Sequence, residues 1–301
     1  MTFRIFTDEP DFARLGPQFR FGAQIHETPQ SAPQWPQPRC MALVKDPALL
    51  APLIESMPGV RRVPCGPDHT LFYSESGGCA AAALPATRAD AERTALTALP
   101  VFVRLIMLKS AWFFMHAAAV RAPQCAVAFI GDNECGKSSL ARALVPAGWD
   151  LLADDSLPLA AAHQNLVCAL PVREAVNVRS LDAQGLVDLR TRGYEESGLV
   201  GFLLPPELPL ATPAPLRLAL YPEWGGPGAE TLCEARSAYA YKKLLAACNT
   251  PLWGDGLEIY AKMIDQLLVQ CRHFRIALTR GAPAPVQSVH RLMRDLGLPS
   301  G

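Results

Sequence analysis

Residues 131 to 139 read GDNECGKSS, in which the second of two glycines is followed by a lysine and two serines. Four residues separate Gly131 from Gly136, and Lys137 and Ser138 follow, which is the spacing of a loop that wraps nucleotide phosphates. Glycine lets the backbone turn its N–H groups toward phosphate oxygens, and the lysine reaches the β- and γ-phosphates. The serine hydroxyl is suited to hold Mg²⁺. The sequence therefore predicts that a nucleoside triphosphate is bound with Mg²⁺ by nine consecutive residues: Gly131, Asp132, Asn133, Glu134, Cys135, Gly136, Lys137, Ser138 and Ser139.

The flanking segments supply the strand and the helix that such a loop needs. Residues 126–130 form an apolar run typical of a buried strand, and residues 139–145 have helix-forming composition. A second strand over 149–153 would bring Asp154 and Asp155 to its C-terminal tip. Because strand tips border the ligand crevice of an open parallel sheet, we expect both carboxylates beside the phosphates.

A histidine interrupts the apolar segment that precedes the loop, residues 111–120. A lone histidine in such a strand is more often a hydrogen-bonded core residue than a catalyst. Here a short hairpin over residues 121–124 would make the two strands neighbours. His116 would then approach Asp154 and tune its protonation. The residues alone leave both roles open.

Together these residues resemble the HPr kinase/phosphorylase family, including the HPr-kinase-related proteins of bacterial peptide-modification cassettes. The resemblance extends over residues 111–159. It implies a protein-serine kinase with an α/β fold, in which a P-loop core similar to that of phosphoenolpyruvate carboxykinase is built on a mixed sheet. It also implies ATP and Mg²⁺ as cofactors. The implied roles are general base for Asp154, partner of that base for His116, phosphate ligand for Lys137, and Mg²⁺ site for Ser138 and Asp155.

The chain also departs from this family pattern. The family loop usually carries small residues where this one has Asn133, Glu134 and Cys135. Glu174 is the nearest match to the family's glutamate-bearing motif, and no arginine-rich segment of the kind linked to phosphorolysis is found. Phosphorolysis and the usual carrier-protein substrate are therefore left open.

Two functions follow as hypotheses. The first is an ATP-dependent kinase that phosphorylates a serine hydroxyl of a small protein or ribosomally made peptide. The second is an ATP-binding accessory protein of a peptide-modification system that performs no phosphotransfer. Phosphoryl transfer needs charge neutralisation, so one cation from the C-terminal half should face the transferred group. The candidates are Arg173, Arg179, Arg217 and Lys262.

Other lysines of that half, Lys242 and Lys243, occur in a helical pattern, where most lysines are solvated. Cys135 has two interpretations. Most cysteines are neutral fillers, but converging loop N–H groups and Lys137 would lower the pKa of a partly exposed thiol and make it reactive toward alkylating reagents.

The composition of the chain limits the classes of binding partner that can be expected. The 28 basic and 28 acidic residues cancel, which gives no argument for nucleic acid or an anionic membrane. The nine cysteines lack regular spacing, so we expect reduced thiols in a cytoplasmic protein. The longest apolar stretch, near residues 111–120, is too short to span a bilayer. The expected partner is a small protein or peptide, and a homo-oligomer is left open.

The pattern along the chain predicts two domains. Residues 1–105 should form a smaller α+β domain that recognises substrate or packs on the core, with a helix starting at Pro47 and a hairpin around residues 75–78. Residues 106–301 should form the HPr-kinase-like P-loop domain. The loop-rich segment 185–215 is a candidate for closing over the site.

Overall fold

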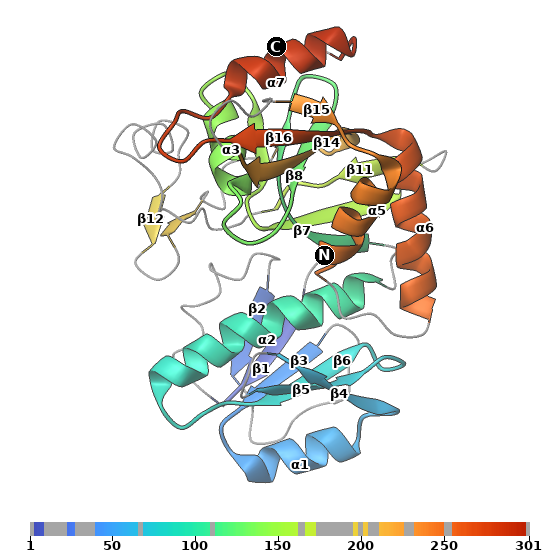
Figure 1. Ribbon diagram of the computed structural model, residues 1–301. Coiled ribbons are helices and arrows are strands. Elements are labelled where there is room, and N and C mark those ends of the chain that lie inside the picture. The colour runs from blue at the N-terminus through green and yellow to red at the C-terminus, as the bar shows by residue number, and fades with distance from the viewer. Residues whose placement is uncertain are drawn as a thin grey trace. The chain divides into compact units, whose positions relative to one another are not determined.

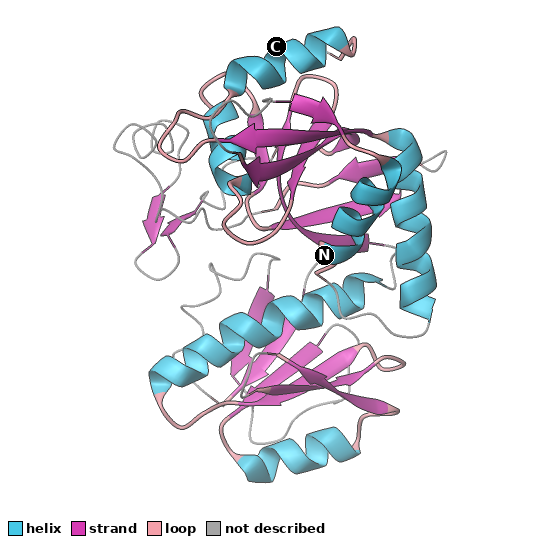
Figure 2. Cartoon of the chain, in the orientation of Figure 1, coloured by secondary structure: helices cyan, strands magenta, loops and turns pink. Residues whose placement is uncertain are grey.

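Two large β-sheets with helices packed against them, and a small two-stranded sheet, give the chain a mixed α/β structure (Figure 1, Figure 2). The computed structural model describes residues 3–8, 23–27, 40–65, 69–108, 112–161, 166–172, 195–197, 201–203, 211–225, 232–249 and 255–298. The chain divides into two compact units, Met1–Ser110 and Ala111–Gly301. Within the described ranges, no helix is both long enough and apolar enough to cross a membrane.

The first unit contains a six-stranded sheet in the order β2-β1-β3-β6-β5-β4. Its elements are β1 (Phe3–Thr7), β2 (Ala23–Glu27), β3 (Cys40–Val44), α1 (Pro47–Glu55), β4 (Val60–Pro64), β5 (Thr70–Ser74), β6 (Cys79–Ala83) and α2 (Arg88–Leu108). Figure 1 shows α1 and α2 on opposite sides of this sheet. The helices bury its apolar faces.

Local patterns predicted several elements of this unit. Asp46 caps α1 by accepting a hydrogen bond from the Ala48 N–H at 2.8 Å, as the Asp-Pro pair at its start indicates. The hairpin of β5 and β6 is confirmed. The parallel pairs of β1 with β2, β1 with β3 and β3 with β6 were not predicted. The helix α2 runs without interruption through Pro100 and past the expected domain boundary at residue 105.

The second unit is built on an eight-stranded sheet. Its strands are β7 (Trp112–Arg121), β8 (Ala126–Ile130), β9 (Asp150–Ala153), β10 (Ser156–Ala161), β11 (Val167–Ala169), β14 (Ala214–Trp224), β15 (Leu232–Glu234) and β16 (Arg272–Leu278). A separate pair is formed by β12 (Glu195–Ser197) and β13 (Gly201–Leu203). The helices are α3 (Lys137–Leu144), α5 (Ser237–Ala246), α6 (Asp255–Gln270) and α7 (Val286–Asp295).

The order of this sheet is β11-β10-β7-β8-β14-β16-β15, and β9 pairs with β7. β8, β14 and β16 are parallel, whereas β7 runs antiparallel to β8. β9 is antiparallel to β7 and therefore runs in the same direction as β8. The carboxyl ends of β8, β9, β14 and β16 thus lie on one side of the sheet, which we call the carboxyl edge. This mixed sheet agrees with the mixed architecture expected from the sequence.

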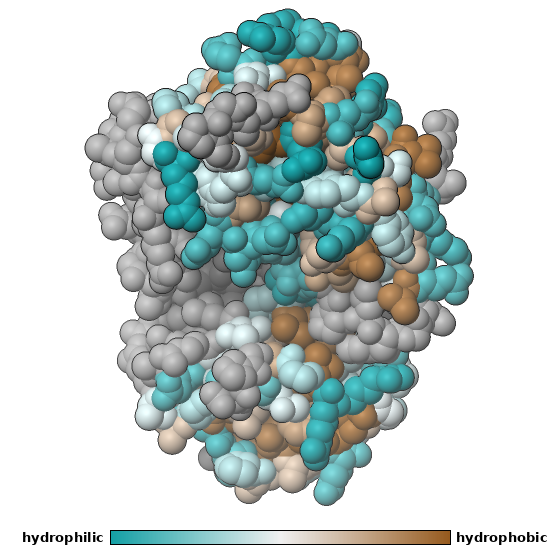
Figure 3. Space-filling view, in the orientation of Figure 1, coloured by the Kyte–Doolittle hydropathy of each residue, from teal (hydrophilic) through white to brown (hydrophobic). Residues whose placement is uncertain are grey.

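Both faces of the second sheet are covered by helices. One face packs on α3 and α7 through a core that includes Val127, Phe129, Leu140, Trp149 and Met293. In the space-filling view, hydrophilic atoms lie along the top of the molecule, where α7 is, and hydrophobic atoms lie beneath them (Figure 3). α6 contacts β11, β14 and β16 and packs on α5. This leaves the carboxyl edge as the place where loops and helix ends meet.

A buried tyrosine joins the two helices α5 and α6. Tyr260 is 1% exposed, and its hydroxyl donates a hydrogen bond to the Leu244 carbonyl at 2.9 Å. We expect Tyr260→Phe to lower the free energy of unfolding by about 1 kcal/mol, because the carbonyl loses a buried donor. Tyr241→Phe is the matched control, because Tyr241 on α5 is 41% exposed. Denaturant unfolding of both variants checks this, and equal losses would show that the Tyr260 hydroxyl does not tie the helices together.

Candidate phosphate-binding site

The predicted phosphate loop lies at the carboxyl edge, between β8 and α3. Ile130 ends β8, and Lys137 begins α3 with Gly136 as its N-cap. Two residues of the loop adopt positive φ, Glu134 at 60° and Gly136 at 98°. The indole N–H of Trp224, at the end of β14, donates to the Glu134 carbonyl at 3.0 Å. The neighbouring strand therefore supports the part of the loop with the least common backbone conformation.

Both glycines are required by close packing. A Cβ atom at Gly131 would come within 2.7 Å of the Cys135 Sγ, and one at Gly136 within 2.4 Å of Leu278 Cδ1. Cys135 is 8% exposed, and burial raises the pKa of its thiol although Lys137 acts in the opposite direction. Of the two interpretations of Cys135, the neutral filler agrees with this environment, and the partly exposed thiol with a lowered pKa does not. Cys135 fills the inside of the loop.

The Lys137 ammonium lies beneath the loop. Its Nζ donates to the Gly131 carbonyl at 2.9 Å and to the Asp132 carbonyl at 2.8 Å, and it lies 3.0 Å from His116 Nε2. The residue is 5% exposed, and burial lowers the pKa of its side chain. An ammonium satisfied by neutral oxygen and nitrogen acceptors can exchange them for phosphate oxygens, which form stronger charge-assisted bonds.

His116 links Lys137 to the acidic pair. Its Nδ1 lies 3.0 Å from Asp155 Oδ1, whereas the sequence led us to expect Asp154 as its partner. The register explains the difference, because β10 pairs Ser156 with His116 and the Ala117 N–H donates to the Asp155 carbonyl at 3.2 Å. Since an ammonium faces Nε2, the Nδ1 atom is assigned as the N–H donor to the carboxylate.

Asp154 lies in a different environment from its neighbour. It is 3% exposed, and its Oδ2 lies 4.0 Å from Arg142 NH1 on α3. The Ser138 hydroxyl donates to the Asp154 carbonyl at 3.2 Å. The Asp155 side chain, in contrast, is 56% exposed. At the bend between β9 and β10, one carboxylate is therefore buried against α3 and the other is accessible.

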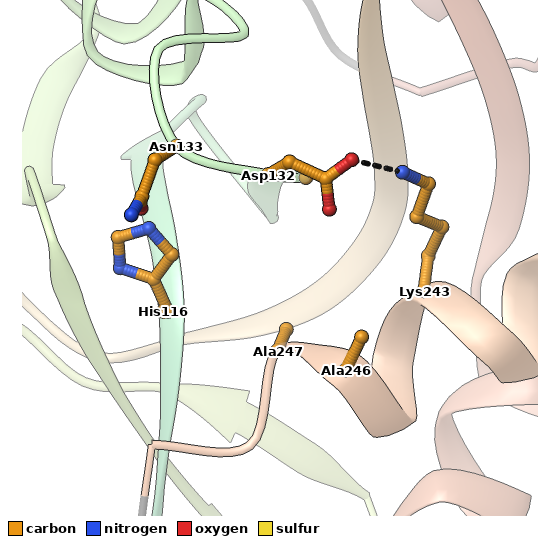
Figure 4. Close-up of a pocket in the computed structure, with 7 residues that line it drawn as sticks. His116, Asp132, Asn133, Lys243, Ala246 and Ala247 are labelled. Carbon is orange, nitrogen blue, oxygen red and sulfur yellow. Dashed lines mark hydrogen bonds and ion pairs between the residues drawn. The ribbon is translucent and has the colours of Figure 1, made fainter.

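A pocket of about 320 Å³ opens beside the loop. It is lined by His116, Gly131, Asp132, Asn133, Lys243, Ala246 and Ala247. Figure 4 shows Asn133 and His116 extending toward one another, with Asp132 and Lys243 facing each other nearby. Lys243 Nζ lies 2.9 Å from Asp132 Oδ2, and this hydrogen bond and charge hold the pKa of Asp132 below its usual range. The α5 helix thus supplies one wall of the pocket.

A side chain near the end of β14 and another in the middle of β16 position α5. The Tyr239 hydroxyl on α5 hydrogen-bonds Glu223, and Arg275 NH2 donates to the same carboxylate at 2.6 Å. The Lys243 ammonium lies over the Tyr239 ring, 5.9 Å from its centroid. The helix that carries Lys243 is therefore attached to strands of the same sheet as the loop.

The cation of the C-terminal half that lines the pocket, Lys243, was not among the candidates. Arg217 lies near the start of β14, away from the carboxyl edge. Lys262 is 69% exposed and pairs with Glu258 on α6. Arg173, Arg179 and Glu174, with most of the segment 185–215, lie outside the described residues. No sequence spacing links Lys243 to the loop, so it could not be selected.

The remaining candidate residues of the loop have exposed side chains. Ser139 is an exposed residue of α3, and the Glu134 side chain is also exposed. All nine cysteines are free. Over the part of the chain that is described, no cluster of three or more His, Cys, Asp or Glu residues could by itself hold a metal ion.

Comparisons with known proteins do not assign this chain to a family. No protein-family model and no curated protein matches the sequence. Among solved structures, it is similar to the HPr(Ser) kinase/phosphatase from Coxiella burnetii, with 14% identity and a TM-score of 0.32. The similarity covers 61% of this chain and 97% of that chain. This TM-score is too low to show a common fold, so the roles of the site residues rest on their own geometry.

The packing of the loop predicts different costs for two glycine substitutions that flank α3. Gly136 and Gly148 both have positive φ, but a Cβ at Gly148 would meet nothing within 4 Å. Each alanine variant loses about 1 kcal/mol from the backbone conformation alone. We expect Gly136→Ala to lower the free energy of unfolding by a further ~1 kcal/mol, because Leu278 must move to make room for the added Cβ atom. Thermal unfolding of both variants checks this, and equal stabilities would show that Leu278 does not constrain the loop.

Proposed function

We propose that this protein is an ATP-dependent kinase that transfers the γ-phosphoryl group to a serine hydroxyl of a small protein or ribosomally made peptide. One observation carries the proposal: the loop lysine Lys137, His116 and Asp155 form a continuous chain of contacts at the carboxyl edge. A phosphate-binding lysine beside an oriented histidine and an accessible carboxylate suits phosphoryl transfer to a hydroxyl. Localisation in the cytoplasm remains part of this proposal.

ATP would enter by replacing the present partners of Lys137. The loop carbonyls and the imidazole satisfy the ammonium only until phosphate oxygens reach it. The loop N–H groups and the N-terminus of α3 favour the same negative charge. Movement of Lys137 toward the phosphates would also release His116 Nε2 on the side that faces the pocket.

The residues present fit Mg²⁺. Ser138 and Asp155 offer a hydroxyl and an accessible carboxylate, the hard oxygen donors that Mg²⁺ takes together with waters and substrate phosphates. When bound, the ion would neutralise charge on the phosphates.

The resemblance and the geometry assign the proton acceptor to different residues. The resemblance assigns it to Asp154, but that carboxylate is 3% exposed and its Oδ2 lies 4.0 Å from Arg142 NH1 on α3. Asp155 is accessible, and His116 holds its carboxylate. We therefore assign proton acceptance to His116 Nε2 and the orientation of the imidazole to Asp155. Asp154 would support α3 and the loop.

Nucleotide binding can be tested at Lys137. Lys137→Met keeps the buried aliphatic stem and removes the charge, so we expect the affinity for Mg-ATP to fall by about 10- to 100-fold. Lys262→Met removes an exposed lysine of α6 and should leave the affinity unchanged. Isothermal titration of both variants measures this. Equal affinity for the wild type and Lys137→Met would exclude the loop as the phosphate site.

The two carboxylates can be separated by matched amide variants. We expect Asp155→Asn to remain folded and to lower phosphotransfer by about 100- to 10,000-fold, the usual contribution of general base catalysis, because His116 loses the carboxylate that orients it. Asp154→Asn should instead lower the free energy of unfolding by up to about 3 kcal/mol, because Arg142 stays buried without its countercharge. Thermal unfolding and mass spectrometry of peptides incubated with Mg-ATP provide the two measurements.

The peptides to be incubated with Mg-ATP in the phosphotransfer measurement are those encoded beside the gene of this protein. A stable but inactive Asp154→Asn together with an active Asp155→Asn would return the base role to Asp154. If the wild type binds Mg-ATP and yields no phosphopeptide from any of them, the protein is better described as an ATP-binding accessory protein.

A further inference from the structure

Two adjacent lysines of α5 have different environments. Lys242 is exposed, whereas the Lys243 side chain is 17% exposed and lines the pocket. One helical turn before Lys243, Tyr239 is fixed to Glu223 and presents its ring to the ammonium. The ammonium is therefore directed into the pocket by the packing of α5.

The pocket is on the side of the loop where transfer would take place. His116 lines it and contacts Lys137, the residue expected to reach the β- and γ-phosphates. Asp132 and Asn133 of the loop form the opposite wall. A cation that enters here from α5 faces the end of the phosphate chain, while the loop itself surrounds the inner phosphates.

We propose that Lys243 binds the terminal phosphate of ATP and that Asp132 holds its ammonium in the nucleotide-free protein. This inference rests on the proposed function, because it requires that the pocket takes ATP. The Asp132 side chain is 77% exposed, and ion pairs with an exposed partner are weak. The pair can therefore open when phosphate arrives, and Lys243 stays close to its final place until then.

The test compares Mg-ATP with Mg-ADP, because only ATP carries the terminal phosphate. In isothermal titration, Lys243→Met should weaken Mg-ATP binding by about 10- to 100-fold, the loss expected for one charge-assisted contact. Its affinity for Mg-ADP should change by less than about 3-fold, since ADP lacks the terminal phosphate that Lys243 would contact. Lys242→Met, the matched control, should bind both nucleotides as the wild type does.

Asp132→Asn tests the second half of the inference. Removal of the competing carboxylate should tighten Mg-ATP binding by about 2- to 5-fold, the range of an exposed ion pair. In the Lys243→Met background the same change should have a smaller effect. Lys243→Arg keeps the charge and should recover part of the lost affinity, which separates loss of charge from loss of packing.

Each outcome bears on a different statement. Equal weakening of Mg-ATP and Mg-ADP by Lys243→Met, or no weakening of either, would overturn the role of Lys243 while the kinase proposal stands. A wild type that binds neither nucleotide would overturn the nucleotide site and the proposed function together. Tightening by Asp132→Asn that is the same with and without Lys243 would show that Asp132 acts by its own charge and does not hold the lysine.

Discussion

The buried ammonium of Lys137 is the constraint on which the candidate site depends. A charged group that is 5% exposed must have acceptors on all sides. The carbonyls of Gly131 and Asp132 supply two of them, which requires the loop to bend around the side chain. His116 supplies the third and is in turn held by Asp155. Hence the loop conformation, the histidine and the accessible carboxylate are linked through one charge.

The sequence predicted the part of the site that is local in the chain. The strand β8, the loop and α3 are consecutive, and their glycines, lysine and apolar residues each favour the observed structure. The tip of β9 could be placed because parallel strands present their carboxyl ends at one edge. The partner of His116 could not, because it depends on the register of Ser156 against β7. A shift of one residue in that register would exchange the two carboxylates.

Contacts between segments that are far apart in the chain could not be predicted from the sequence. Lys243 meets Asp132 across 111 positions, and nothing in the helical pattern of α5 distinguishes it from Lys242. In the parallel pair of β3 and β6, Cys40 lies opposite Cys79 in the strand register, and no turn signal in the sequence marks such a pairing. The partner of Arg142 could in principle have been sought from the sequence. Arg142 is a charged residue on the apolar side of α3, and such a charge needs a partner of opposite charge once that side is buried.

The attachment of α5 explains how two lysines from distant segments can act on one phosphate chain. Lys137 is positioned by β8, and Lys243 by a helix that Tyr239 and Glu223 tie to the end of β14. β14 is the hydrogen-bonded neighbour of β8, so loop and helix are held at the same edge of one sheet. Pre-positioned charges need little reorganisation when the ligand binds. Only short movements of the two ammonium groups, away from loop oxygens toward phosphate, would then separate the nucleotide-free state from the bound state.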